Sequence, residues 1–144
     1  MTIARLAALC LLATGVASAE PVRRFAGFEV HYNAFRADFL PETMSAKHGL
    51  TRAADRGLLN VTVLRARSDA TFEAIEADVT ATVSREGEPA SEVRLRPVRE
   101  PGSVSYMGSF RLEGERPYRF DLSVKPFGAE KAETIRFRQS VAAQ

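Results

Sequence analysis

The sequence predicts an all-β protein, an immunoglobulin-like antiparallel β-sandwich of about seven strands with one short inserted helix. Two observations lead to this prediction. From Val22 onward, apolar and polar residues alternate with a period of two, which places successive side chains on opposite faces of a sheet. Turn-forming glycines and prolines separate the alternating runs at regular intervals, as in sandwich proteins. The same pattern leaves an open barrel as an alternative.

The alternating runs define the strands in chain order. The expected strands cover residues 28–35, 59–64, 75–83, 93–98, 104–112, 118–124 and 135–138. The clearest alternation lies in residues 75–83, where apolar residues occupy every odd position and polar residues the even ones. Pro97 indicates an edge strand or a strand end, because proline cannot donate a hydrogen bond to a ladder.

One segment departs from the period of two. Pro41 suits the start of a helix, and Glu42 suits its positive end. His48 followed by Gly49 is typical of a helix end. We therefore expect a two-turn helix over residues 41–48, inserted between two strands.

The first nineteen residues have the organisation of a secretory signal peptide. Arg5 precedes an apolar run over residues 6–17, and the Ala-Ser-Ala sequence of residues 17–19 matches a cleavage site. We expect cleavage after Ala19, which leaves residues 20–144 as the exported chain. A retained amino-terminal anchor is the alternative, although the run is shorter than the roughly 20 residues that a membrane-spanning helix needs.

Removal of the signal peptide changes what the composition implies. It removes Cys10, the one cysteine, and Arg5, so that 19 basic residues remain against 18 acidic ones. Because this balance gives no long-range field, we expect neither nucleic acid nor an anionic membrane as a partner. No later apolar stretch is long enough to span a membrane. Residues 20–144 fit a single domain that is stabilised by its core without disulfides.

Three segments carry a resemblance to a known family: FEVHYNAF at 28–35, FLPETMSAKHGLTR at 39–52 and GLLNVTVL at 57–64. In this order they resemble the amino-terminal half of small exported proteins of Gram-negative bacteria, the family called domain of unknown function 4426. The likeness extends more loosely through VSYMGSFRL, residues 104–112, to the end of the chain. The resemblance implies a periplasmic β-sandwich with no assigned activity and supplies no catalytic residues.

Polar residues around the inserted helix form the candidate site. His31, Asn33, Asn60 and Thr62 fall on the polar faces of two expected strands, and Arg52 lies in the loop after the helix. In one interpretation these side chains converge on a pocket for a ligand or partner. In the other, which we favour, His31 and Asn33 hydrogen-bond to the helix and satisfy its unpaired backbone groups.

A copper site is a further hypothesis, because imidazole and thioether ligands suit Cu(I). His31, Met44, His48 and Met107 are the candidate ligands, and Met44 and His48 share a helix face at i, i+4. Against it, the sequence has no H-x-M or M-x-x-M cluster, and a methionine on a short amphipathic helix usually fills a core. We therefore expect no cofactor and no metal.

Catalytic motifs are absent from the sequence. It contains no G-x-S-x-G and no H-E-x-x-H, and its two histidines are the only groups suited to act as a base near neutral pH. We therefore expect no enzymatic activity.

Arginines recur on the outward faces of the expected strands, at Arg94, Arg96, Arg111, Arg119, Arg136 and Arg138. Such a set could form a basic face for an anionic partner. Acidic residues are interspersed among them, so an ordinary solvated surface is the interpretation that we favour.

Together these observations predict a periplasmic, non-enzymatic accessory or binding module that contacts an envelope protein or a small ligand. The candidate contact residues are His31, Asn33, Arg52 and Asn60. The alternative is a carrier of copper or another metal that uses His31, Met44 and His48.

Overall fold

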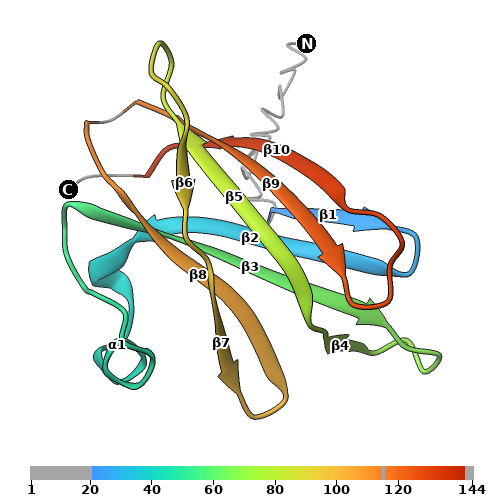
Figure 1. The fold of residues 1–144 in the computed structure, drawn as a ribbon. Helices are drawn as coiled ribbons and strands as arrows, with labels where there is room; N and C mark the ends of the chain where they lie inside the picture. Colours follow the sequence, from blue (N-terminus) through green and yellow to red (C-terminus); the bar gives the residue numbers. More distant parts are fainter. Residues whose placement is uncertain (1–20, 115, 142–144) are drawn as a thin grey trace, which may run out of the picture.

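Two antiparallel sheets pack face to face in the computed structural model, which describes residues 21–114 and 116–141 (Figure 1). The larger sheet has the strand order β1-β2-β3-β8-β7, with β4 paired to the end of β3, and the smaller sheet has the order β10-β9-β5-β6. This confirms the predicted all-β sandwich. The predicted signal peptide, residues 1–19, lies outside the described residues. Within the described part, no helix has the length and apolar character needed to cross a membrane.

The elements follow one another along the chain with short connections. Their bounds are β1 Val22–Phe25, β2 Phe28–Arg36, the 3-10 helix η1 Ala37–Phe39, α1 Glu42–His48, β3 Arg56–Ala66, β4 Phe72–Ala74, β5 Ala77–Ser84, β6 Ser91–Val93, β7 Arg96–Glu100, β8 Ser103–Arg111, β9 Tyr118–Pro126 and β10 Glu133–Gln139. The described chain has ten strands where about seven were expected. The additional ones are the short strands β1, β4 and β6.

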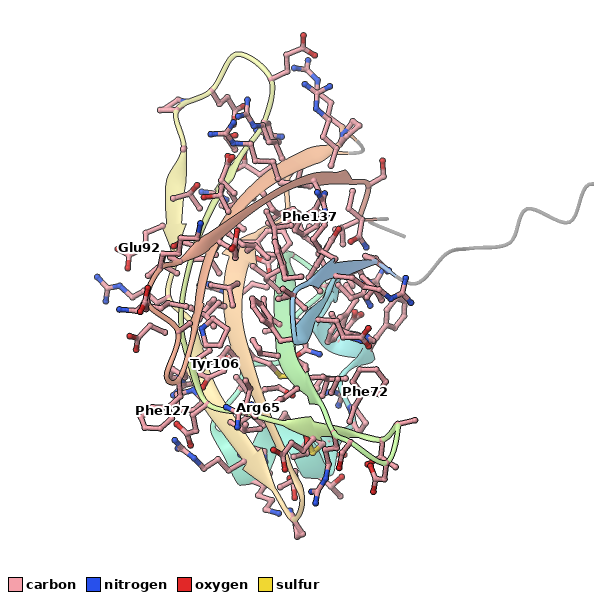
Figure 2. The ribbon with its side chains drawn as sticks, turned by 90° about the vertical axis from the view of Figure 1, so that its right-hand side faces the viewer. Arg65, Phe72, Glu92, Tyr106, Phe127 and Phe137 are labelled. Atoms are coloured by element: carbon pink, nitrogen blue, oxygen red, sulfur yellow. The ribbon has the colours of Figure 1, made fainter. Side chains whose placement is uncertain are left out.

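The main core lies between the two sheets. Alternate residues of β2, β3, β5, β8, β9 and β10 point inward and form one buried apolar cluster, as the period of two predicted. An aromatic contact links the two sheets at its centre, since the ring of Tyr32 on β2 lies 4.4 Å from that of Phe137 on β10 between centroids. Phe137 also stacks on Phe120 of its own sheet, with the centroids 4.8 Å apart. Figure 2 shows Phe137 between the sheets.

A second apolar cluster covers the opposite face of the larger sheet. Leu58 and Met107 point away from the main core and pack under η1 and α1, together with Leu40 and Met44. The helix has the predicted signals: Pro41 is its N-cap, and Gly49 ends it in the left-handed region at φ 63°. The inserted helix is therefore packed on the sheet through its own small core.

One extended segment belongs to both sheets. It forms β6 at the end of the smaller sheet and then β7 at the end of the larger one (Figure 1). The crossing passes very close to β8, because a β-carbon on Gly108 would lie 2.5 Å from the carbonyl oxygen of Arg94. Pro97 lies in β7, in agreement with its predicted position at a sheet edge.

A side-chain hydrogen bond closes the connection from β8 to β9. The hydroxyl of Tyr118 accepts a hydrogen bond of 2.6 Å from the backbone nitrogen of Glu113 and lies 3.2 Å from its carbonyl oxygen. A tyrosine at the start of a strand that bonds to backbone a few residues upstream is the tyrosine corner of immunoglobulin-like sandwiches. It holds the loop against the end of the sandwich.

Candidate functional site

Four of the residues singled out in the sequence are neighbours on the outer face of the larger sheet. The register between β2 and β3 places His31 directly opposite Thr62, and Asn33 directly opposite Asn60. All four side chains lie on the face opposite the main core, since the residues that alternate with them belong to that core. We call these four residues the polar stripe.

His31 is bonded to a buried carboxylate. Its Nε2 atom lies 2.7 Å from Oε1 of Glu29, a residue that is only 8% exposed. The other carboxylate oxygen of Glu29 lies 3.3 Å from Nε of Arg24 on β1. The predicted hydrogen bond from His31 to the inserted helix is therefore wrong, because its imidazole is engaged within its own strand.

Asn33 is held by the last strand, not by the helix. Nε2 of Gln139 donates a hydrogen bond of 3.1 Å to Oδ1 of Asn33 and one of 2.5 Å to the carbonyl oxygen of Ala34. The backbone nitrogen of Ala34 in turn donates to Oε1 of Gln139 at 3.1 Å. Since β1 pairs with β2 only as far as His31, the amide of Gln139 takes the place of a strand neighbour beyond that point.

Asn60 has a polar atom that the fold leaves unsatisfied. Its Oδ1 atom is buried and has no hydrogen-bond partner among the described residues. The register places Asn60 between Asn33 on β2 and Met107 on β8, at the border between the polar stripe and the second apolar cluster. A buried acceptor without a partner costs about 1 to 3 kcal/mol, so this atom is a local cost to the fold rather than a group that a bound molecule can reach. Thr62 is satisfied by Ser105, 3.1 Å away on β8.

Arg52 is not part of the polar stripe. It donates a hydrogen bond of 3.0 Å to the carbonyl oxygen of Asp38 in η1. Asp38 is bonded to Arg36, and this hydrogen bond lowers the pKa of the Asp38 carboxyl below its ordinary value. The guanidinium of Arg36 also lies over the ring of Phe39, 4.9 Å from its centroid. We call Arg36, Asp38, Phe39 and Arg52 the η1 corner.

The candidate copper ligands do not come together as one set. Met107 is buried in the second apolar cluster, with Met44 packed against it. His48 is engaged by a carboxylate of β7, since its Nε2 atom lies 2.7 Å from Oε1 of Glu100. His31 is bonded to Glu29 on β2. Across residues 21–114 and 116–141, no three histidine, cysteine, aspartate or glutamate side chains form a group that could hold a metal ion.

Two residues that organise the site, Glu29 and Gln139, are not among the candidates predicted from the sequence. A signal for each was present. Glu29 has the same strand parity as His31, two residues away, so the two side chains had to be neighbours on one face. Gln139 falls on the inward parity of its strand, after Ile135 and Phe137, where a polar residue needs a hydrogen-bond partner.

The comparisons with known proteins identify the family. The family model described as domain of unknown function DUF4426 matches residues 22–142. The chain belongs to the DUF4426 family. This confirms the resemblance found in the sequence, and the match covers every strand of both sheets. None of the curated proteins matches the chain.

Solved structures include a member of the DUF4426 family with the same fold. A crystal structure of a DUF4426 family protein from Pseudomonas aeruginosa PAO1 matches with a TM-score of 0.74 and 27% sequence identity, over 85% of this chain and 94% of that one. FetP from uropathogenic Escherichia coli strain F11 is more distant in sequence, at 12% identity. A copper-bound variant of FetP with a single substitution matches with a TM-score of 0.63, over 86% of this chain and 95% of that one. FetP as isolated after expression in the periplasm of E. coli BL21(DE3) matches with a TM-score of 0.62, over 85% and 93%. At this identity the likeness to FetP concerns the fold alone.

Proposed function

We propose that this DUF4426 protein is a non-enzymatic binding module of the Gram-negative periplasm, and that it engages an envelope protein through the η1 corner and the polar stripe. The observation that carries the proposal is Phe39, which is 62% exposed and held under the guanidinium of Arg36. Aromatic residues and arginine are the side chains that protein interfaces most often use as anchors. An exposed ring fixed in this way needs little further ordering when a partner covers it.

The polar stripe supplies the second part of the proposed surface. Asn33 is exposed, and His31 is half-buried. A partner that covers this face can form hydrogen bonds with the polar stripe and pack on the ring of Phe39. A small ligand is the alternative occupant of the same surface.

Site-specific photo-crosslinking tests this proposal. A photoreactive phenylalanine analogue replaces Phe39 or Asn33, and the protein is irradiated in periplasmic extract. Phe127 is the matched control, because it is 77% exposed and lies in the hairpin between β9 and β10 on the other sheet. We expect the same covalent adduct from positions 39 and 33 and none from position 127.

A second experiment asks whether a folded variant loses binding. With the photoreactive residue at position 33, Phe39→Ser should abolish capture of the partner. Its melting temperature should stay close to that of the wild-type protein, as is typical of substitutions at exposed positions. Equal adducts at all three positions, or capture that survives Phe39→Ser, would contradict the proposal.

The periplasmic location and the absence of catalysis belong to the same proposal. Both histidine rings face carboxylates, and in the part of the chain that the structure describes neither ring is bonded to a hydroxyl group that it could activate. The organisation of residues 1–19 supports export. The intact mass of the protein from an osmotic-shock fraction should correspond to a chain that starts at Glu20.

A copper carrier is the second candidate. Two observations favour it: the fold is shared with copper-bound FetP, and Met44 and Met107 meet in one cluster beneath the helix that carries His48. The arrangement argues against it, because Met107 is only 8% exposed and His48 is bonded to Glu100. Metal analysis of protein purified without chelator should give sub-stoichiometric copper and zinc. Stoichiometric copper in the wild-type protein that is lost in His48→Ala would favour the copper carrier over the binding module.

A further inference from the structure

The outer face of the smaller sheet carries two arginines directly opposite one another. The register between β9 and β10 pairs Arg119 with Arg138, and both side chains are exposed. Like charges at directly opposite positions of neighbouring strands destabilise a sheet. Neither side chain belongs to the core, so the fold gains nothing evident from the pair.

The nearest carboxylate does not neutralise this pair. Asp121 is shared, since its oxygens lie 3.4 Å from Nε of Arg119 and 2.9 Å from Nε of Arg136. Within residues 21–114 and 116–141, Arg138 has neither an ion pair nor a hydrogen bond from its side chain, and the same holds for Arg116. On this face Asp121 is therefore divided between Arg119 and Arg136, and it leaves Arg138 without an ion pair in the described chain. Arg116 lies at the end of the same face.

These side chains line a cavity of about 350 Å³ between the start of β9 and the turn from β5 to β6. The lining includes four arginines and two glutamates, at Arg85, Arg116, Arg119, Arg138, Glu86 and Glu88. Arg85 is already engaged by Glu88 and Glu113. Figure 2 shows nitrogen-tipped side chains gathered around this upper end of the molecule. Among the described residues, the lining thus carries a net of two positive charges, and three of its arginines lack a described carboxylate of their own.

We propose that this cavity binds a multivalent oxyanion through Arg116, Arg119 and Arg138. Guanidinium groups bind carboxylate and phosphate oxygens with paired hydrogen bonds, and they are less strongly hydrated than ammonium groups. An anion placed between Arg119 and Arg138 turns their mutual repulsion into two attractions. The cavity lies on the smaller sheet, whereas the polar stripe and the η1 corner lie on the larger one, so this proposal is independent of the proposed function.

Thermal unfolding with defined anions tests the site. Melting temperatures are measured in sodium pyrophosphate, in sodium citrate and in sodium chloride at equal ionic strength. A ligand that binds only the folded state raises the melting temperature, so pyrophosphate or citrate should raise it by several degrees above chloride. The larger of the two shifts identifies phosphate or carboxylate as the preferred group.

Two variants separate this site from general charge effects. In Arg138→Gln, pyrophosphate and citrate should no longer raise the melting temperature above its value in chloride. Arg94→Gln should keep it, because it removes the same charge from an exposed arginine between β6 and β7 that has no ion pair in the described part of the chain. No rise in the wild-type protein, or an equal rise in wild type and Arg138→Gln, would overturn the proposal.

A double-mutant cycle without added anion tests the premise of repulsion. Arg119→Gln, Arg138→Gln and the double variant are compared in low salt, where exposed charges are least screened. We expect an unfavourable coupling between the two arginines, so that Arg138→Gln alone melts no lower than the wild-type protein. A favourable coupling would show that the fold itself uses the pair, and would overturn the proposal.

Discussion

The ring of Phe110 on β8 lies so close to Gly57 on β3 that a β-carbon at position 57 would come within 2.2 Å of the Cζ atom of the ring. The two residues are directly paired in the sheet, and the ring covers the glycine from the side of the main core. The absence of a side chain at position 57 thus allows the aromatic ring to reach the Tyr118 ring, 5.4 Å away.

Gly57→Ala should destabilise the protein by roughly 1 to 3 kcal/mol, because the added methyl group displaces a ring in a packed core. Chemical denaturation of the variant measures this loss. Gly57→Ala combined with Phe110→Leu should recover part of the loss caused by the first substitution, relative to Phe110→Leu alone. A Gly57→Ala protein as stable as the wild type would contradict the close contact.

Tyr32→Ala should be severely destabilising, by about 3 to 5 kcal/mol. Tyr32 is only 8% exposed, and its ring lies 4.4 Å from the ring of Phe137 across the sandwich, so truncation removes a contact between the two sheets. Tyr32→Phe is the matched control, since it keeps the ring and should retain most of the stability. Similar losses in both variants would mean that the hydroxyl, rather than the ring, is what matters.

His31→Ala should cost about 1 to 3 kcal/mol, because Glu29 is buried and would lose the nearer of its two side-chain partners, His31 and Arg24. The reason differs from the expected loss of a backbone partner on the helix, since the imidazole is bonded to Glu29 instead. The coupling in a cycle with Glu29→Gln measures the interaction. If His31→Ala melts like the wild-type protein but no longer captures the partner crosslinked at position 33, His31 is a binding residue and not a structural one.

Glu100 should make the stability depend on pH in the acid range. Hydrogen bonds from Lys47 and His48, in that order, lower the pKa of the Glu100 carboxyl in the folded protein. A lowered pKa stabilises the fold at pH values above the ordinary carboxyl value of about 4.3, and this contribution is lost as the pH falls through the folded pKa. The melting temperatures of wild type and Glu100→Gln should therefore differ near neutral pH and converge in acid. A difference that persists unchanged in acid would exclude this linkage.

The period of two was sufficient to predict the long strands β2, β3, β5, β8, β9 and β10, because each of them has one face in the main core. Val30, Tyr32, Phe120 and Leu122 are all buried on the predicted parity. The helix at residues 42–48 was equally predictable, since Pro41 and Gly49 mark its ends locally. Local chemistry determined these elements, and tertiary packing did not alter them.

Two features were not predictable from local pattern. Residues 93–98 were expected to form one strand, but β6 ends at Val93 and β7 begins at Arg96 in the other sheet. Val93 is buried in the main core and Val98 in the second cluster, and a short apolar run does not indicate that its two ends belong to different sheets. Met107 falls on the outward parity of its strand, yet it is buried because η1 and α1 pack over that face.

The candidate site was predicted in part for the same reason. Parity placed His31 and Asn33 on one face, and the register then brought them beside Thr62 and Asn60. The parity of a strand does not show which distant segment of the chain contacts that face. Asn33 is met by Gln139, 106 positions away, and not by the helix that follows it.

The segment of residues 91–100 has a consequence for how the protein comes apart. Along one side of the sandwich this segment joins the smaller sheet to the larger one by continuous backbone, and along the opposite side the amide of Gln139 joins β10 to β2. Separating the two sheets would break the Gln139 hydrogen bonds on one side and strain the continuous segment on the other. We therefore expect the protein to unfold in one cooperative transition, with no stable half-sandwich in between.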